Sequence, residues 1–252
     1  MINSDEWITH LTELRKRLIW VMLFFILTLA AGLYMSPKVL LYIKNRPAAA
    51  DIAWNVFSLT DGMFIYMKCG FLVAVFFTVP LALYHIWAFV RPGLTEDEAK
   101  KTFWFVPLAF VLFFIGVAFS FYVAFPMMVT FLSSMNKTVG AVETYGMDKY
   151  FSLMFSVVFP LALAFEMPAV VLFLTRLGIL GPALLRKARK YVYLALAVVG
   201  SMISPPDFVS HLSVTIPLIL LFELSILVSR WYLHRKELNN PLIDPKGGTN
   251  HV

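Results

Sequence analysis

The chain has 252 residues, of which 60% are hydrophobic and 14% charged, whereas soluble domains average about 45–50% apolar and about 25% charged residues. This excess does not fit inside one soluble core, so the composition favours an integral membrane protein that crosses the bilayer several times. The net charge of +6 does not indicate nucleic-acid binding, because the basic residues flank apolar segments and form no long basic stripe. A single cysteine, Cys69, excludes an internal disulfide and a cysteine zinc site.

Six apolar stretches predict an all-α protein with six transmembrane helices. They cover residues 18–35, 63–89, 103–125, 151–174, 191–203 and 212–229. The fifth is shorter than the about 20 residues that a spanning helix needs. Because the last two stretches are short and closely spaced, we expect them to form a tight hairpin. Residues 1–230 therefore form the predicted transmembrane domain. Residues 231–252 lose periodicity and gather Asn, Pro and Gly, which predicts a flexible cytoplasmic tail.

The basic residues predict an orientation in the cytoplasmic membrane. They concentrate before the first stretch and in every second connection after it, so the positive-inside rule places both termini in the cytoplasm. Lys68 lies inside the second stretch near its outer end, where we expect its side chain to extend outward to water. Prolines inside the stretches predict kinked, curved helices; they are Pro80, Pro107, Pro160, Pro168 and Pro217.

The segment before the first stretch holds the first candidate site residue, Glu13. Residues 3–17 carry apolar side chains at helical spacing, which predicts an amphipathic helix on the inner membrane surface. Arg17 follows Glu13 by four residues, so a helical ion pair explains Glu13 without a binding role. The pattern alone favours that structural explanation.

Three acidic residues follow the second stretch, in the segment Thr95-Glu96-Asp97-Glu98. Carboxylates on this side suit a guanidinium ligand, because each carboxylate can accept two parallel hydrogen bonds from it. Thr95-x-x-Glu98 is also a capping box that opens the third helix, and acidic residues in a first turn stabilise the helix dipole. The residues alone leave both explanations open.

Glu166 and Glu223 are the only carboxylates deep within predicted spans. Ionisable residues there are costly, so each is a functional candidate; a protonated or internally hydrogen-bonded structural glutamate is the alternative. At the outer hairpin, Ser204-Pro205-Pro206-Asp207 predicts a rigid turn with Asp207 as the N-cap of the last helix.

The sequence gives no sign of an enzyme. It has no Gly-rich phosphate loop, zinc-protease motif or nucleophile elbow, and its five histidines are too scattered to predict a metal or cofactor site. A proton-coupled solute transporter using Glu166 and Glu223 is a second function class, but it predicts inverted repeats, which the sequence lacks. A membrane-embedded hydrolase would need a nucleophile, base or metal at one depth, and we find no such set.

Four segments together resemble the TatC family, the multispanning core of the twin-arginine protein translocase. In chain order they are HLTELRKR at 10–17, WAFVRPGL at 87–94 with Glu98, FEMP at 165–168 and SPPD at 204–207. The similarity runs from about residue 7 to residue 230. It implies a six-helix bundle, curved like a cupped hand, that recognises folded precursors through signal peptides with consecutive arginines.

The resemblance also implies a role for each candidate residue. Glu13 and Glu98 match cytoplasmic acids that receive the arginine pair, and Glu166 matches an intramembrane glutamate that contacts the signal peptide and single-span TatA/TatB-type subunits. Asp207 matches an outer acid of uncertain role, and His211 stands where many relatives have glutamine. Further implied partners are membrane lipid and other copies of the chain, with no nucleic acid; the implied energy source is the proton gradient.

Overall fold

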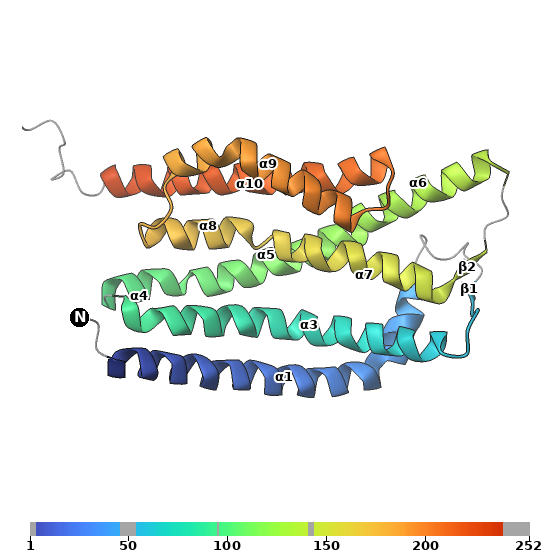
Figure 1. Cartoon of the computed structure of the whole chain (residues 1–252), viewed down its shortest axis with the longest axis horizontal. Coiled ribbons are helices and arrows are strands. Elements are labelled where there is room, and N and C mark those ends of the chain that lie inside the picture. The colour runs from blue at the N-terminus through green and yellow to red at the C-terminus, as the bar shows by residue number, and fades with distance from the viewer. Residues whose placement is uncertain (1–3, 46–53, 95, 141–143, 239–252) are drawn as a thin grey trace, which may run out of the picture.

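The computed structural model describes residues 4–45, 54–94, 96–140 and 144–238, and nearly all of them are helical. The one exception to the helical architecture in these residues is a short parallel pairing of β1 (Trp54–Asn55) with β2 (Tyr145–Gly146). Figure 1 shows the helices side by side along the long axis of the molecule, with β1 and β2 at one end and α4 at the other. We call these the β end and the α4 end.

The helices form six rods, each of which contains one of the six apolar stretches. In chain order the rods are α1 (Ser4–Lys44); α3 (Asp61–Val90); α5 (Phe105–Phe119), the π-helical turn η2 (Ser120–Ala124) and α6 (Phe125–Thr138); α7 (Met147–Ala164) and α8 (Met167–Arg176); α9 (Pro182–Ile203); and α10 (Phe208–Leu238). The turn η1 (Arg91–Gly93) and α4 (Glu96–Phe103) join the second rod to the third. All rods except α9 are long and apolar enough to cross a membrane. The start of α1 and the end of α10 lie at the α4 end (Figure 1).

Several helices extend beyond the apolar stretches that predicted them. The amphipathic segment and the first stretch form one continuous helix, α1. α9 begins at Pro182, well before residue 191, and α10 continues to Leu238. Backbone hydrogen bonds hold a helix wherever they can form, while hydropathy marks only the part that faces lipid. The tail expected from residue 231 is therefore helical as far as Leu238, and its remainder lies outside the described residues.

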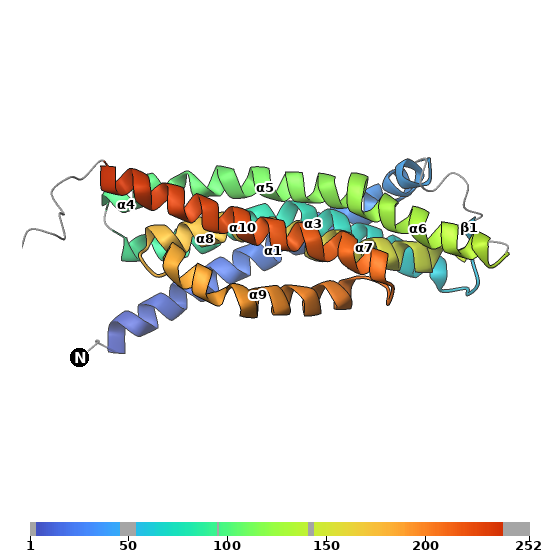
Figure 2. The same cartoon turned by 90° about the horizontal axis from the view of Figure 1, so that it is seen from above.

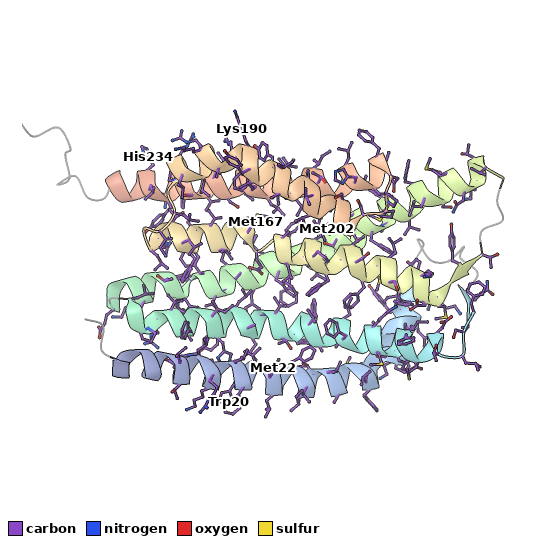
Figure 3. All side chains as sticks on the ribbon, in the orientation of Figure 1. Trp20, Met22, Met167, Lys190, Met202 and His234 are labelled. Carbon is purple, nitrogen blue, oxygen red and sulfur yellow. The ribbon has the colours of Figure 1, made fainter. Side chains whose placement is uncertain are left out.

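Many of the exposed side chains are large and apolar. Trp20 on α1 points away from the other helices (Figure 3), and Trp20 and Met22 are both exposed. In Figure 2, α9 lies to one side of the bundle, with α10 as its main contact. A chain with so much exposed apolar surface is stable only where lipid covers that surface.

Close backbone contact joins α1 to α3. A Cβ atom on Gly32 would lie 2.5 Å from the carbonyl oxygen of Gly70, so only glycine fits at this crossing. Ser36 Oγ donates to the carbonyl oxygen of Tyr66 at 3.2 Å, and small residues with interhelical hydrogen bonds are typical of helix contacts in membranes. This contact fixes α1, and with it Glu13, against α3.

We therefore expect Gly32→Ala to lower the free energy of unfolding by about 1–3 kcal/mol, because the added methyl group meets backbone that cannot move aside. Gly62→Ala is the matched control, since a Cβ there meets nothing within 4 Å and alanine favours a helix by about 0.5–1 kcal/mol. Thermal unfolding in detergent measures both. Equal melting temperatures for the two variants would contradict the close contact.

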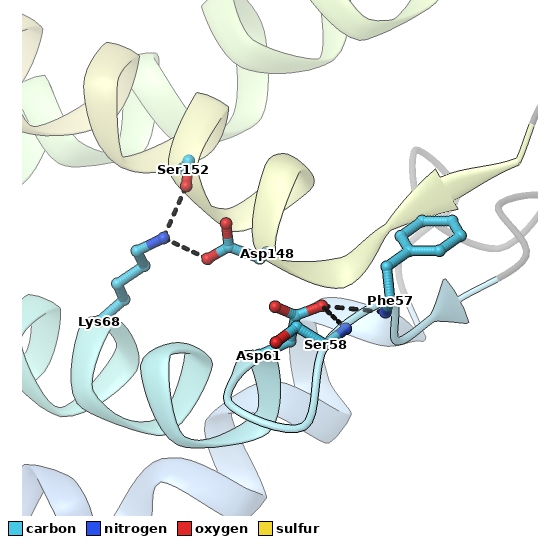
Figure 4. Close-up of polar contacts among 6 residues, drawn as sticks. All are labelled: Phe57, Ser58, Asp61, Lys68, Asp148 and Ser152. Atoms are coloured by element: carbon cyan, nitrogen blue, oxygen red, sulfur yellow. Dashed lines mark hydrogen bonds and ion pairs between the residues drawn. The ribbon is translucent and has the colours of Figure 1, made fainter.

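Lys68 joins α3 to α7 near the β end. Its Nζ donates to Asp148 in an ion pair and to Ser152 Oγ at 2.6 Å (Figure 4). The Lys68 side chain therefore contacts a neighbouring helix. The sequence had predicted that it would extend outward to water. In the same figure Asp61 Oδ2 accepts hydrogen bonds from the backbone N–H groups of Phe57 and Ser58, each at 2.9 Å, which holds the turn that begins α3.

Lys68→Met should destabilise the protein by about 1–2 kcal/mol, because it leaves Asp148 without its cation in a half-buried position. Ser152→Ala removes only a hydroxyl and should cost less. A thermal-unfolding cycle of Lys68→Met, Asp148→Asn and the double variant checks this. The sum of the two single losses of unfolding free energy should exceed the loss in the double variant. If the losses are strictly additive, the ion pair contributes nothing to stability.

Candidate functional site

A large cavity of about 810 Å³ lies at the α4 end, between α1, α3, η1 and α4. Pro92 fixes a tight turn after α3, and the N–H of Leu94 donates to the carbonyl oxygen of Arg91 at 3.0 Å. This turn places α4 beside the end of α3. Four charged side chains line the cavity, and aromatic side chains, Trp87 among them, complete its wall; the charged ones are Arg17, Arg91, Glu96 and Lys100.

Glu13 lies next to this cavity through its ion pair with Arg17. Arg17 donates to Glu13 Oε1 from Nε at 3.1 Å and from Nη2 at 2.5 Å. The helical ion pair predicted from the spacing is therefore confirmed. Because Arg17 itself lines the cavity, its ion pair connects Glu13 to the cavity wall.

Glu98 lies in α4, between Glu96 and Lys100 of the cavity wall. Its side chain and Thr95 are outside the part of the chain that the structure describes, so the capping box stays a prediction. Glu96 belongs to the acidic segment that the sequence analysis considered for a guanidinium ligand, but the resemblance implied a role for Glu98 alone and none for Arg91. The Pro92-Gly93 turn was the available signal, since a turn directly after a helix brings the following residues back beside it.

Glu166 lies at a break in the fourth rod. Pro168 cannot donate a backbone hydrogen bond, and its ring clashes with the carbonyl four residues before it, so α7 ends at Ala164 and α8 begins at Met167. The Glu166 side chain is 5% exposed. Neither carboxyl oxygen has a hydrogen-bond partner in the described part of the chain. A cavity of about 70 Å³ between α3, α5 and α8 has Glu166 in its wall.

A second, apolar hollow of about 380 Å³ follows along the same helices toward the β end. Phe113 of α5 lines it, one helical turn from Ala109 in the wall of the first cavity, and residues of α3 line both hollows. Residues four apart share a helix face. The two hollows therefore lie in series on one face of the bundle, with Glu166 toward the α4 end.

Glu223 has a different environment, between α9 and α10. Arg189 Nη2 donates to Glu223 Oε2 at 2.7 Å, and the Tyr193 hydroxyl donates to Oε1. The structure does not bring Glu223 and Glu166 into one cavity. Glu223 is thus the hydrogen-bonded structural glutamate that was one alternative for both residues, and spacing could not reveal a partner 34 positions away.

Asp207 caps α10 as its position predicted. Its Oδ1 accepts the backbone N–H of Ser210 at 2.7 Å, while its buried Oδ2 has no partner within the described chain. His211 lies one turn further on, with Nδ1 3.5 Å from Thr215 Oγ1. Both residues lie at the start of α10, which is the end of that helix farther from the α4 end (Figure 1). Among the described residues no three His, Cys, Asp or Glu side chains gather into a group that could hold a metal ion.

The family model of TatC, the Sec-independent protein translocase protein, matches residues 9–217. The chain belongs to the TatC family. It is 41% identical over 220 residues to TatC of Halalkalibacterium halodurans, covering 87% of each chain. It is 38% identical over 229 residues to TatCy of Bacillus subtilis (91% of this chain and 90% of that one), and 32% identical over 237 residues to TatC of Escherichia coli (92% and 90%).

Two crystal structures described as the twin-arginine translocase receptor TatC match the fold of this TatC-family chain. Their TM-scores are 0.79 and 0.80 at 29% and 28% identity, and the matches cover 87% and 89% of this chain and 99% of each of those chains. The resemblance seen in the four motifs and the all-α membrane architecture are confirmed. The chain is a multi-pass membrane protein of a protein-transport family and not of an enzyme family.

Proposed function

We propose that this TatC-family chain is the signal-peptide receptor and assembly platform of a twin-arginine translocase in the cytoplasmic membrane. The α4 end is its cytoplasmic side. The distribution of basic residues supports this orientation, because Arg17, Arg91 and Lys100 all lie at that end. Both termini are then cytoplasmic, and Asp207 and His211 lie on the outer side.

One observation carries the proposal: the segments that bear Glu13 and Glu98 meet at one cavity at the α4 end. Glu13 and Glu98 bind the two guanidinium groups of the signal peptide, because a carboxylate and a guanidinium form paired, charge-assisted hydrogen bonds. The surrounding Arg17, Arg91 and Lys100 repel a cation that lacks such partners, so removal of either carboxylate leaves the site strongly unfavourable for arginine.

The apolar part of the signal peptide follows the two hollows past Glu166. Both hollows have mostly apolar walls, which suit a hydrophobic segment. Bound signal shifts the bundle toward a state that recruits single-span TatA/TatB-type subunits near Glu166. The proton gradient drives the export of the folded cargo. Membrane lipid and further copies of this chain complete the assembly, which involves neither cofactor nor nucleic acid.

The experiment that tests the proposal compares two peptides on the detergent-solubilised protein. A twin-arginine signal peptide should bind well, and its twin-lysine version about tenfold or more weakly, because lysine cannot form the paired hydrogen bonds of a guanidinium. Isothermal titration calorimetry measures both affinities. Equal binding of the two peptides, or no binding of either, would refute the receptor function.

A further inference from the structure

Trp87 separates the two cavities that lie nearest to the α4 end. The same indole ring lines the large cavity with Arg17 and Glu96 and the small cavity with Glu166. Contacts with Phe103 at 5.2 Å and Tyr84 at 6.2 Å between ring centroids hold it in place. One side of the partition is therefore a charged cavity at the end of the bundle, and the other is an apolar cavity within the spans.

Two residues with buried, unpartnered polar atoms line the small cavity. Trp87 is 8% exposed and Glu166 is 5% exposed. The indole Nε1 of Trp87 and both carboxyl oxygens of Glu166 have no hydrogen-bond partner within the described chain. The rest of the wall is aliphatic or aromatic. Because buried polar groups in native proteins are nearly always hydrogen-bonded, both residues call for the same small polar ligand.

We propose that Trp87 and Glu166 share bound water in this cavity, supplied from the α4-end cavity around the Trp87 ring. Water both donates and accepts, so it serves the indole N–H, which only donates, and the carboxyl group together. The cavity volume of about 70 Å³ is large enough, since a water molecule needs only about 10–15 Å³ of such space. Trp87 is thus a second polar member of the Glu166 site.

The water also explains how a carboxyl group without a partner in the chain is tolerated within the membrane. A desolvated carboxyl group is unfavourable, and bridging water is nearly as good a partner as a protein group. The 380 Å³ hollow beyond Glu166 differs, because its walls are apolar and apolar cavities stay dry. The proposed water site therefore ends at Glu166.

Hydroxyl-radical footprinting by X-ray radiolysis, read by mass spectrometry on the whole detergent-solubilised protein, tests this inference. Radicals formed from bound water label the side chains beside it. Phe105 lines the cavity, whereas Phe125 and Phe151 are similarly buried elsewhere. We expect Trp87 and Phe105 to be labelled several-fold faster than Phe125 and Phe151. Labelling of Trp87 and Phe105 at the rate of the other two would overturn the inference.

Two variants separate polarity from shape. Glu166→Leu removes the carboxyl group and should reduce the labelling of Phe105 to the rate of Phe151, because the small cavity dries; Trp87 also lines the α4-end cavity and keeps part of its labelling. Glu166→Gln keeps a hydrogen-bonding group of the same size and should leave the labelling unchanged. Unchanged labelling in Glu166→Leu, or an equal loss in both variants, would contradict the shared water. The protein is labelled without any peptide, so the result is independent of the receptor function.

Discussion

Glu98→Gln is expected to bind a twin-arginine signal peptide about ten- to a hundredfold more weakly than the wild type. Charge-assisted hydrogen bonds contribute about 1.5–3 kcal/mol, and each 1.4 kcal/mol is tenfold in affinity. Glutamine retains a capping box with Thr95, so the helix start is preserved while the charge is lost. The repulsion from Arg91 and Lys100 in the cavity wall enlarges the effect.

Glu13→Gln is the companion variant, with a smaller expected loss, because part of the Glu13 charge is already used by Arg17 at 2.5 Å. Calorimetric titration gives both affinities, and circular dichroism establishes that each variant is folded. Ser152→Ala at the β end should bind as the wild type does. Wild-type affinity in both Glu variants would exclude these carboxylates as the arginine receptor; loss in Glu13→Gln alone would leave Glu98 with the capping role.

The two membrane glutamates should respond in opposite ways to replacement by leucine. Glu166→Leu removes no hydrogen bond within the described chain, so we expect its free energy of unfolding to stay within about 1 kcal/mol of the wild type. Export of a folded reporter should be lost, because the group proposed to contact the signal peptide and partner subunits is gone. Glu166→Leu should therefore abolish export of the reporter without unfolding the protein.

Glu223→Leu should instead lower the stability of the protein. Any loss of export should follow from that lower stability alone. The change leaves Arg189 and Tyr193 without their acceptor, which lowers the melting temperature. Adding Arg189→Leu should restore part of the loss, because no cation is then left unpaired. Thermal unfolding and reporter export in cells that lack their own TatC homologue measure both effects.

A proton-coupled transporter would behave differently, since its two carboxylates would serve one pathway. Equal loss of transport in Glu166→Leu and Glu223→Leu, with both proteins stable, would therefore support that function class against the receptor. The separate environments of the two glutamates, one beside α3 and α5 and the other between α9 and α10, already argue for different roles.

The sequence by itself determined the class of protein, the six helical rods and the family. Hydropathy is a property of consecutive residues, so it locates the spans without knowledge of the fold. Local spacing was also sufficient for the Glu13–Arg17 pair and for Asp207 as an N-cap, since both contacts join residues within one helical turn.

Only the tertiary structure decided the partners of residues that are far apart in the chain. Lys68 and Asp148 are 80 positions apart, and Arg189 and Glu223 are 34 apart. The tertiary structure also brought Trp87 into the wall of the Glu166 cavity. Such contacts depend on how the helices pack, which side-chain periodicity within one helix does not specify. Glu166 and Glu223 occupy similar positions within their apolar stretches, yet their surroundings in the fold differ. Glu223 bonds to an arginine, whereas Glu166 lines a cavity.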